Sequence, residues 1–378
     1  MKILLCNDFL NDGGTETVLQ TLVERLVRDG HDITLLASPR SDDEIKGTVY
    51  TKVHYIRMRL PKKTGKIYSP AVFFNLVSRK FHRLIGFIRL SFHKYDVCIS
   101  MKEGVHIRDC GYIRAKKRIL WIHCDLRVYP WFIITIFHSY QRARKFIEKK
   151  YDTAVCVSET TRDGYLETIG DTHNIRVLYN PIDWKQIRAL SEEECSIHKN
   201  PERPLIIAVG RLAEVKNFMT LLKACDRIKD KFPFDLWILG DGPDREMLEE
   251  YIRLNDLTFV KLLGYINNPF PLMKQGDLFV STSVSESYGL AIQEALILGV
   301  PVVAVNCPGV AESLDTRFGV LIDNSVEKLS ETILDMLSTP SKLNTYRVRI
   351  SEQYPVSSLY EDRLDKICEL LVETDEII

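Results

Sequence analysis

The sequence predicts an α/β protein built from two doubly wound domains that face a central cleft, and three observations support this prediction. The chain has 378 residues, which is longer than one domain of ordinary size. Short buried-strand patterns alternate with amphipathic-helix patterns, which is typical of parallel sheets covered by helices. A polar connector over residues 191–204 interrupts the alternation, and the pattern then starts again. In such sheets ligands bind beyond the carboxyl ends of the strands.

The first domain opens with a strand, a glycine-containing loop and a helix. Lys2–Cys6 is a short apolar run and predicts a buried strand, after which Asn11–Gly14 predicts a loop. Thr15–Arg28 has apolar residues three and four positions apart, so it predicts an amphipathic helix that Gly30 ends. Later strands of this domain are predicted at Ile33–Ala37, Val97–Ser100, Arg118–Ile122 and Ala154–Val157.

The second domain repeats the alternation after Asn180–Asp183 and the polar connector. Its predicted elements are strands at Leu205–Val209, Leu236–Leu239, Phe259–Leu262, Leu278–Ser281 and Val302–Val305, and helices at Phe218–Ile228, Arg245–Arg253 and Gly289–Leu298.

Composition excludes several classes of protein. Hydrophobic residues make up 45% and charged residues 27%, which is typical of a globular protein with a full core. Lys and Arg total 51 and so do Asp and Glu, so net charge does not hold the chain on nucleic acid. No segment has the pattern of a signal peptide or a membrane span. The nine cysteines include no C-x-x-C pair, which favours a reducing, intracellular compartment and argues against disulfides or a zinc site.

Two cations follow the first strand of the second domain. Arg211 and Lys216 lie in the loop between that strand and the next helix. Cations at this edge of a sheet, beside a helix amino terminus, are suited to an anion such as a diphosphate. The same pair also fits an ordinary solvated loop. The glycine-rich turn Gly240–Pro243 has a simpler interpretation, a tight turn that places Pro243 at the first helical position.

Two carboxylates flank the start of a later helix. Glu286 precedes the helix and Glu294 lies in its second turn, so the pair spans roughly 12 Å at 1.5 Å per residue. This length is comparable to the distance from the sugar ring to the ribose of a sugar nucleotide. The backbone amides of Tyr288, Gly289 and Leu290 lie between the carboxylates and can hold the phosphates. Alternatively, both glutamates are ordinary surface acids.

These motifs together resemble the retaining glycosyltransferases of family 4, which have the two-domain GT-B fold with Rossmann-like domains. The resemblance rests on G-R-L…K-N, L-G-D-G-P, E-x7-E, E-A-L-x-L-G-x-P-V-V-A and G-V-x-E over residues 205–322. Gly13-Gly14-x-Glu16 and Asn180–Asp183 are similar to the family's glycine loop and inter-domain element. The resemblance implies an acceptor-binding domain over 1–180 and a donor-binding domain over 181–355. Residues 356–378 would form a helix that returns to the first domain.

The resemblance also implies roles for the matched residues. Arg211 and Lys216 would bind the donor diphosphate and act in catalysis, while Gly13 and Gly14 would close on the phosphates from the other domain. Glu294 would hold the ribose hydroxyls, and Glu286 would hold hydroxyls of the transferred sugar. The remaining matched residues are His123, expected near the transferred sugar at a strand end, and Tyr288, Gly289 and Leu290, expected to present amides. Neither a metal nor another cofactor is expected, because the cations can stabilise the leaving group.

A basic segment of the first domain predicts a different partner. Between Glu44 and Asp96 there is no acidic residue, but there are twelve cations and nine aromatic residues, and Val77–Phe92 has the pattern of a basic amphipathic helix. We interpret it as a face for anionic lipid headgroups or the acceptor, formed by Lys62, Lys63, Arg79, Lys80, Arg83 and Arg89. The alternative is a helix packed on its own domain with a solvated basic rim. Nucleic acid is not expected, since the sequence has no recognised motif for it.

The leading hypothesis is therefore an enzyme that moves a sugar from a nucleotide-sugar donor, preferably a UDP-sugar and otherwise a GDP-sugar, to a glycan or lipid-linked acceptor. It would act in cell-surface polysaccharide or glycolipid synthesis, in the cytoplasm and peripherally on the inner face of the membrane. Two alternatives stay open, a nucleotide-sugar epimerase of GT-B fold and a non-catalytic subunit that binds sugar nucleotides. An epimerase would convert the donor without an acceptor.

Overall fold

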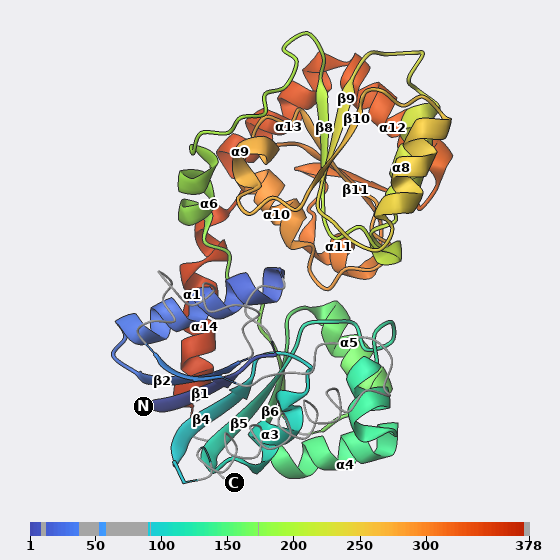
Figure 1. Cartoon of the computed structure of the whole chain (residues 1–378). Helices are drawn as coiled ribbons and strands as arrows, with labels where there is room; N and C mark the ends of the chain where they lie inside the picture. The colour runs from blue at the N-terminus through green and yellow to red at the C-terminus, as the bar shows by residue number, and fades with distance from the viewer. Residues whose placement is uncertain (9–12, 38–52, 58–89, 91, 173, 374–378) are drawn as a thin grey trace, which may run out of the picture. The chain divides into compact units, whose positions relative to one another are not determined.

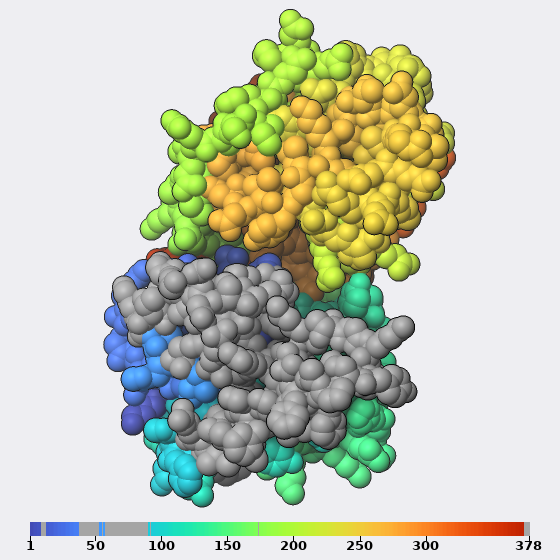
Figure 2. All heavy atoms as spheres, in the orientation of Figure 1, coloured from blue at the N-terminus to red at the C-terminus, as the bar shows by residue number. Residues whose placement is uncertain are grey.

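The computed structural model describes residues 1–8, 13–37, 53–57, 90, 92–172 and 174–373 (Figure 1, Figure 2). The chain divides into two compact units, Met1–Pro181 with Asp362–Ile378, and Ile182–Glu361. The sequence predicts domain boundaries after residues 180 and 355. In the described residues no helix combines the length and the apolar character needed to cross a bilayer.

The first unit contains a parallel sheet whose described strands have the order β3-β2-β1-β4-β5-β6-β7. Its direction of winding changes between β1 and β4, which are adjacent and parallel. The strands are β1 Lys2–Cys6, β2 Asp32–Ala37, β3 His54–Arg57, β4 Tyr95–Ser100, β5 Ala115–Ile122, β6 Thr153–Cys156 and β7 Asn174–Val177.

Two hydrophobic clusters cover the two faces of this sheet. Because side chains alternate along a strand, Ile3 and Leu5 belong to one cluster, and Leu4 and Cys6 belong to the other. The helical segments are α1 Gly14–Arg28, α3 His106–Tyr112, the π-helix η2 Ile133–Phe137, α4 Tyr140–Lys150, α5 Glu159–Thr168 and α14 Glu361–Val372.

Helix α14 comes from the far end of the chain and completes the first unit. Ile367, Leu370 and Leu371 are buried in the same cluster as the inner face of α1. The buried ammonium of Lys117 donates to the carbonyls of Leu370 at 2.8 Å and Glu373 at 3.0 Å. The first unit is therefore discontinuous in sequence.

The second unit is continuous and holds a parallel sheet of order β10-β9-β8-β11-β12-β13. Here the winding reverses between β8 and β11. The strands are β8 Leu205–Val209, β9 Asp235–Leu239, β10 Val260–Gly264, β11 Leu278–Ser281, β12 Val302–Val305 and β13 Gly319–Ile322.

Helices lie along the second sheet, and two clusters of buried residues again form its core. Helix α6 follows Asn180–Asp183 and ends where the polar connector over residues 191–204 begins. The sequence predicts no helix or strand at this position. The helical segments are α6 Trp184–Ser191, η3 Glu214–Lys216, α7 Phe218–Asp226, α8 Arg245–Leu254, α9 Phe270–Met273, α10 Leu290–Ile297, α11 Pro308–Ser313, α12 Val326–Ser338, α13 Pro340–Gln353 and η4 Val356–Leu359.

Candidate functional site

The candidate site lies at the carboxyl ends of β8 and β11 in the second unit (Figure 1). These two strands are neighbours at the point where the sheet changes its direction of winding, and open α/β sheets bind ligands at this position. The loop after β8 carries Arg211 and Lys216. The loop after β11 carries Glu286 and leads into α10, which carries Glu294.

The two loops are tied to each other by hydrogen bonds at Lys216. The Thr282 hydroxyl donates to the Lys216 carbonyl at 2.9 Å, and the Val284 N–H donates to the Val215 carbonyl at 2.9 Å. Gly210 leaves room for the aliphatic part of the lysine, since a Cβ at Gly210 would lie 3.3 Å from Lys216 Cδ and Cε. The backbone of the site therefore fixes the direction of the Lys216 side chain.

Lys216 and Glu286 form an ion pair in this structure. Lys216 Nζ lies 2.5 Å from Glu286 Oε1, and the Ser283 hydroxyl donates to the same oxygen at 2.7 Å. The side chains are 23% and 16% exposed. The resemblance assigns Lys216 to the diphosphate and Glu286 to the sugar. In this structure the charges of these two side chains neutralise each other.

Glu294 is the second carboxylate that Lys216 influences. It lies in the second turn of α10 and is half-buried. Burial raises the pKa of Glu294 to about 7, although the positive charge of Lys216 acts in the opposite direction. Lys216 therefore forms an ion pair with Glu286 and also acts electrostatically on Glu294.

The amino terminus of α10 adds backbone dipoles to these charges. Gly289 precedes the helix with φ +63°, a left-handed conformation that glycine adopts without strain, and Leu290 is the first helical residue. Tyr288 is buried, with 6% of its surface exposed. Because helix amino termini attract anions, this end of α10 is suited to phosphate groups.

Arg211 differs from Lys216 in its surroundings. It is exposed, and it makes no ion pair within the residues that the structure describes. It follows β8 by two residues, so it lies at the same edge of the sheet as Lys216. Its guanidinium is therefore available for an incoming anion.

The glycine-rich turn after β9 supports the Arg211 loop. A Cβ at Gly240 would lie 1.9 Å from the Gly210 carbonyl oxygen, and one at Gly242 would lie 2.3 Å from the Leu212 carbonyl oxygen. Only glycine permits this approach of the two backbones. The prediction for Pro243 is wrong, because Asp244 caps α8 and its first residue is Arg245.

In the first unit, the glycine loop and His123 both lie at the carboxyl edge of the sheet. Gly13 has φ +97° and precedes α1, whose first residue is Gly14. His123 follows β5, and its backbone N–H donates to Glu103 Oε2 at 2.8 Å. The His123 ring stacks on Trp121 with a centroid distance of 6.1 Å.

His123 is a neutral imidazole at neutral pH. Burial lowers its pKa to about 3, and the positive charge of Lys102 contributes to this shift. Its buried Nε2 has no hydrogen-bond partner within the described part of the protein. The ring can therefore form a hydrogen bond with a ligand through Nε2, but it does not supply a positive charge.

Two contributors to these sites, Ser283 and Glu103, are absent from the sequence analysis. Ser283 lies three residues before Glu286, a spacing at which one turn brings the two side chains together. Glu103 comes shortly after β4, so the strand-end rule that selected His123 could also have selected it. The expected lipid face at Lys62, Lys63, Arg79, Lys80, Arg83 and Arg89 lies outside the described residues.

Both halves of the chain match known families. Residues 12–186 match the family described as Glycosyltransferase Family 4, and residues 203–339 match Glycosyl transferases group 1. The chain is 30% identical over 188 residues to the poly(glycerol-phosphate) alpha-glucosyltransferase of Bacillus subtilis, covering 46% of this chain and 28% of the relative.

Further relatives are glycosyltransferases of other bacteria. An N-acetylgalactosaminyltransferase of Campylobacter jejuni acting on N-acetylgalactosamine-N,N'-diacetylbacillosaminyl-diphospho-undecaprenol is 32% identical over 166 residues, 42% of this chain and 44% of the relative. An uncharacterized glycosyltransferase of Haemophilus influenzae is 22% identical over 360 residues, 93% of this chain and 95% of the relative. The chain spans between about a quarter and a half of the length of four of the curated relatives that it matches.

Solved structures share the fold along the whole chain. Anabaena Alr3699/HepE in complex with UDP has a TM-score of 0.72 at 18% identity, covering 98% of this chain and 99% of that one. WaaG, a glycosyltransferase involved in lipopolysaccharide biosynthesis, has a TM-score of 0.67 at 14% identity, covering 98% and 100%. With family matches in both units, the chain belongs to the family 4 glycosyltransferases and has the GT-B fold.

Proposed function

We propose that this chain transfers a sugar, with retention of configuration, from a nucleotide-sugar donor to a glycan or lipid-linked acceptor in cell-surface polysaccharide or glycolipid synthesis. The observation that carries the proposal is the convergence of Lys216, Glu286, Glu294 and the α10 amino terminus at the β8–β11 edge. The UDP bound to HepE supports a UDP-sugar before a GDP-sugar. The diphospho-undecaprenol acceptor in the name of the Campylobacter relative supports a lipid-linked acceptor.

Stabilisation of the leaving diphosphate is the main chemical task of the site. Cleavage of the sugar–phosphate bond leaves a nucleoside diphosphate whose negative charge grows towards the transition state. The guanidinium of Arg211 and the backbone amide of Leu290 are the donors for that charge. Donors aimed at developing charge lower the barrier, because they bind the transition state more tightly than the ground state.

Lys216 exchanges its partner when the donor binds. In this structure its ammonium is paired with Glu286, so a diphosphate at the same edge competes for it. As Lys216 turns to the diphosphate, the Glu286 carboxylate becomes available to accept hydrogen bonds from hydroxyls of the transferred sugar. Donor binding thus converts one ion pair into two contacts at opposite ends of the cleaved bond.

The proposed reaction requires neither a protein nucleophile nor a metal. The acceptor attacks from the side of the leaving group, and the cations of Arg211 and Lys216 take the place of a divalent ion. His123 would contribute a neutral hydrogen bond to the sugar through its Nε2. Transfer is therefore expected to persist after treatment with EDTA.

The test is transfer from a panel of UDP- and GDP-sugars to lipid-linked glycans, with each donor also incubated alone. We expect one donor to be consumed rapidly only when an acceptor is present. Conversion of a donor alone to another nucleotide sugar would show an epimerase. Tight donor binding without any consumption would show a non-catalytic subunit.

We also propose that the first unit contacts the inner, anionic face of the membrane. Residues 127–150, which we call the aromatic–basic segment, carry exposed Val128, Tyr129, Trp131, Ile134 and Tyr140, with exposed fractions of 40–56%. η2 packs on α4 within this segment, whose teal-green atoms are visible in Figure 2. Its exposed cations include Arg142, Lys145 and Lys149, and its one acid is Glu148. Two further exposed cations are already paired with carboxylates, Arg127 with Asp125 and Glu167, and Arg144 with Glu148.

This composition supports a lipid interface. Trp and Tyr rings prefer the headgroup level, and clustered cations are attracted to anionic lipids.

Sedimentation with anionic and zwitterionic vesicles at low salt tests the proposal. The wild-type chain should sediment with anionic vesicles only, and Trp131→Ser with Ile134→Ser should reduce this. The matched control is Leu254→Ser with Tyr265→Ser, two exposed residues of the second unit. Equal losses in both double variants would contradict the proposal.

A further inference from the structure

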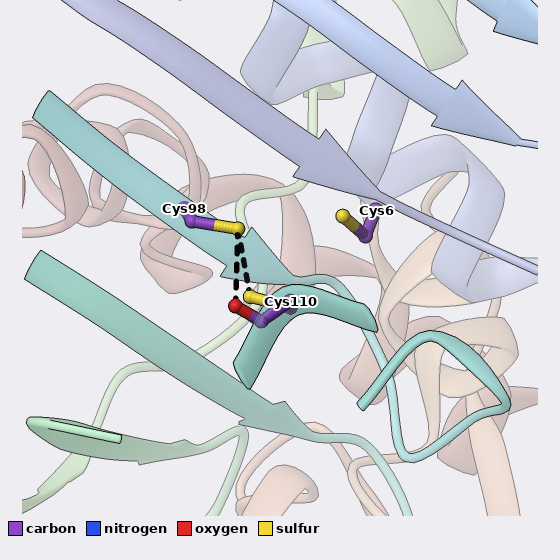
Figure 3. Close-up of side chains that lie close together, drawn as sticks. All are labelled: Cys6, Cys98 and Cys110. Carbon is purple, nitrogen blue, oxygen red and sulfur yellow. Dashed lines mark hydrogen bonds between the residues drawn. The ribbon is translucent and has the colours of Figure 1, made fainter. Parts of the chain in front are cut away.

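Three buried thiols meet in the first unit, far apart in sequence. Cys6 is the last residue of β1, Cys98 lies in β4 and Cys110 lies in α3, as Figure 3 shows. The Sγ atoms of Cys98 and Cys110 are 2.8 Å apart, and all three sulfurs lie within 4.8 Å of one another. Because Cys6, Cys98 and Cys110 are far apart in the chain, the C-x-x-C spacing typical of metal sites does not identify them.

The sheet register explains why the thiols converge. Leu4 of β1 is paired with Cys98, and Cys6 with Ser100, so Cys6 and Cys98 belong to the same face of adjacent strands. Leu4, Cys6, Cys98 and Cys110 all lie in one hydrophobic cluster, in which α3 covers this face. The group therefore joins three separate elements of the fold.

The thiols lie in a hydrophobic cluster, and among the described residues the polar side chains of Arg118, Tyr151 and Tyr95 act on them. Cys6, Cys98 and Cys110 are 0–1% exposed. The Arg118 guanidinium donates to the Ile113 carbonyl at 2.8 Å and 3.2 Å, and its positive charge acts on Cys98 and Cys110. The Tyr151 hydroxyl donates to the Ile107 carbonyl at 2.6 Å, and it also acts on the Cys110 thiol.

The donor set selects the kind of ion that could bind. Neither a carboxylate nor an imidazole belongs to this group, so hard cations that need oxygen ligands are excluded. Three thiolates around a divalent ion carry one net negative charge, which the nearby Arg118 can offset. Metal–sulfur bonds of about 2.3 Å in a trigonal arrangement need sulfur separations of about 4 Å. All three sulfurs lie within 4.8 Å of one another, and those of Cys98 and Cys110, which are 2.8 Å apart, have to separate when the ion binds.

We propose that Cys6, Cys98 and Cys110 form a binding site for one thiophilic divalent ion of the zinc group, held as a tris-thiolate. Binding replaces three S–H bonds with three metal–sulfur bonds and releases three protons. The ion would tie β1, β4 and α3 together inside the first unit. This site is independent of the proposed sugar transfer, whose charged groups lie in the second unit.

Cadmium is a suitable probe, because thiolate-to-cadmium charge transfer absorbs in the ultraviolet and reports the sulfur ligands directly. We titrate the full-length, fully reduced chain with Cd²⁺ and expect one equivalent per chain with this absorption. Loading should be slow and should saturate in rate at high Cd²⁺, because the 0–1% exposure requires a local opening. The midpoint of thermal unfolding should rise with Cd²⁺.

Matched variants locate the ligands. Cys98→Ala and Cys110→Ala should each abolish the stoichiometric absorption, whereas Cys156→Ala should keep it. Cys156 is also 0% exposed and ends β6 in the same sheet and the same cluster. If the cluster variants do not fold, alkylation of the wild-type chain replaces them, and Cd²⁺ should then protect three of the nine thiols.

Three results would overturn the proposal. They are the absence of charge-transfer absorption in the folded wild-type chain, an equal loss of absorption in Cys156→Ala, and protection of fewer than three thiols. A Cys98–Cys110 disulfide formed with a peroxide, with no Cd²⁺ uptake by the reduced chain, would show that the group is a redox pair instead.

Discussion

Lys216 is the residue on which the charges of the donor site converge. It pairs with Glu286 at 2.5 Å and lowers the pKa of Glu294, against the larger effect of burial. Arg211, at the same edge, is exposed and unpaired among the described residues. The two cations therefore differ, since Lys216 has to leave Glu286 to reach a diphosphate, whereas Arg211 makes no ion pair among the described residues.

Removal of either cation should slow transfer without unfolding the chain. We expect Lys216→Ala and Arg211→Ala each to lower kcat/KM by on the order of 10²-fold, because each removes a charge directed at the leaving diphosphate. For Arg211→Ala the free energy of unfolding should change by less than about 1 kcal/mol, since Arg211 is exposed. Urea unfolding provides the control. Near wild-type turnover in both variants would contradict the assignment of the site.

Glu286 should affect the free nucleotide and the sugar in opposite ways. Glu286→Ala releases Lys216 from its ion pair, so UDP should bind more tightly, on the order of fivefold for about 1 kcal/mol. Transfer should fall, because hydroxyls of the sugar lose their acceptor. Calorimetric titration with UDP measures the first effect. Weaker UDP binding would mean that Glu286 itself contacts the nucleotide.

Glu294 should make stability depend on pH near neutrality. Its pKa is about 7 in the folded chain and ordinarily about 4.5, so folding favours the protonated form. The contribution of the Glu294 side chain to the free energy of unfolding is present in full below pH 4.5 and is lost as the pH rises to about 7. Glu294→Gln stays neutral, so relative to wild type it should gain about 3 kcal/mol of stability between pH 4.5 and pH 8. Urea unfolding at both pH values measures it, and an equal difference at both would contradict the raised pKa.

At the scale of elements, α10 and α11 position the carboxylates of the site. The buried Gln293 of α10 donates to the Ser313 carbonyl of α11 at 2.6 Å and accepts from the Tyr354 hydroxyl at 2.5 Å. Gly309 of α11 packs against the backbone of the loop that carries Glu286. A displacement of α11 would therefore move Glu286 without touching its side chain.

Gly309→Ala tests this support. A Cβ there would lie 1.9 Å from the Glu286 carbonyl oxygen, so the loop has to shift. We expect transfer to fall at least tenfold, since small misplacements of reacting groups are costly in rate. The control is Gly299→Ala after α10, where φ is +79° but a Cβ has no atom within 4 Å. It should cost about 1 kcal/mol of stability through backbone strain and leave kcat/KM unchanged. Equal rates in the two variants would contradict the role of α11.

At the scale of the whole molecule, the sequence predicts the central strands well but only one of the four edge strands, β10. The predicted bounds of β1, β8, β11 and β12 are confirmed, because these strands are short runs of residues buried on both faces. No strand was predicted at β3, β7 or β13, which lie at sheet edges. Edge strands are less buried, and β7 shows this along its whole length.

The sequence selects candidate residues for the site but does not predict their contacts. Strand-end position and motif spacing selected Arg211, Lys216, Glu286 and Glu294. Neither could show that Lys216 and Glu286, seventy residues apart, form an ion pair in this structure. Pairings of this kind, like the three thiols of the first unit, depend on which strands become neighbours, and sequence separation carries no information about that.

The division of the chain leads to a prediction about where the donor binds. Arg211, Lys216, Glu286 and Glu294 all belong to the continuous unit Ile182–Glu361, which has its own hydrophobic core. The first unit needs residues from both ends of the chain, because α14 fills its core. The second unit alone can therefore be expressed as a single segment, whereas the first cannot.

We expect residues 182–361 expressed alone to fold and to bind UDP within about tenfold of the full chain, since the cations and the α10 amino terminus are all present. Transfer should be absent, because His123 and the Gly13–Gly14 turn belong to the first unit. Calorimetric titration with UDP measures the affinity, and Lys216→Ala in the same segment provides the control. A folded segment that does not bind UDP would show that the first unit supplies much of the nucleotide site, in which case substitutions at Gly13 should weaken UDP binding in the full chain.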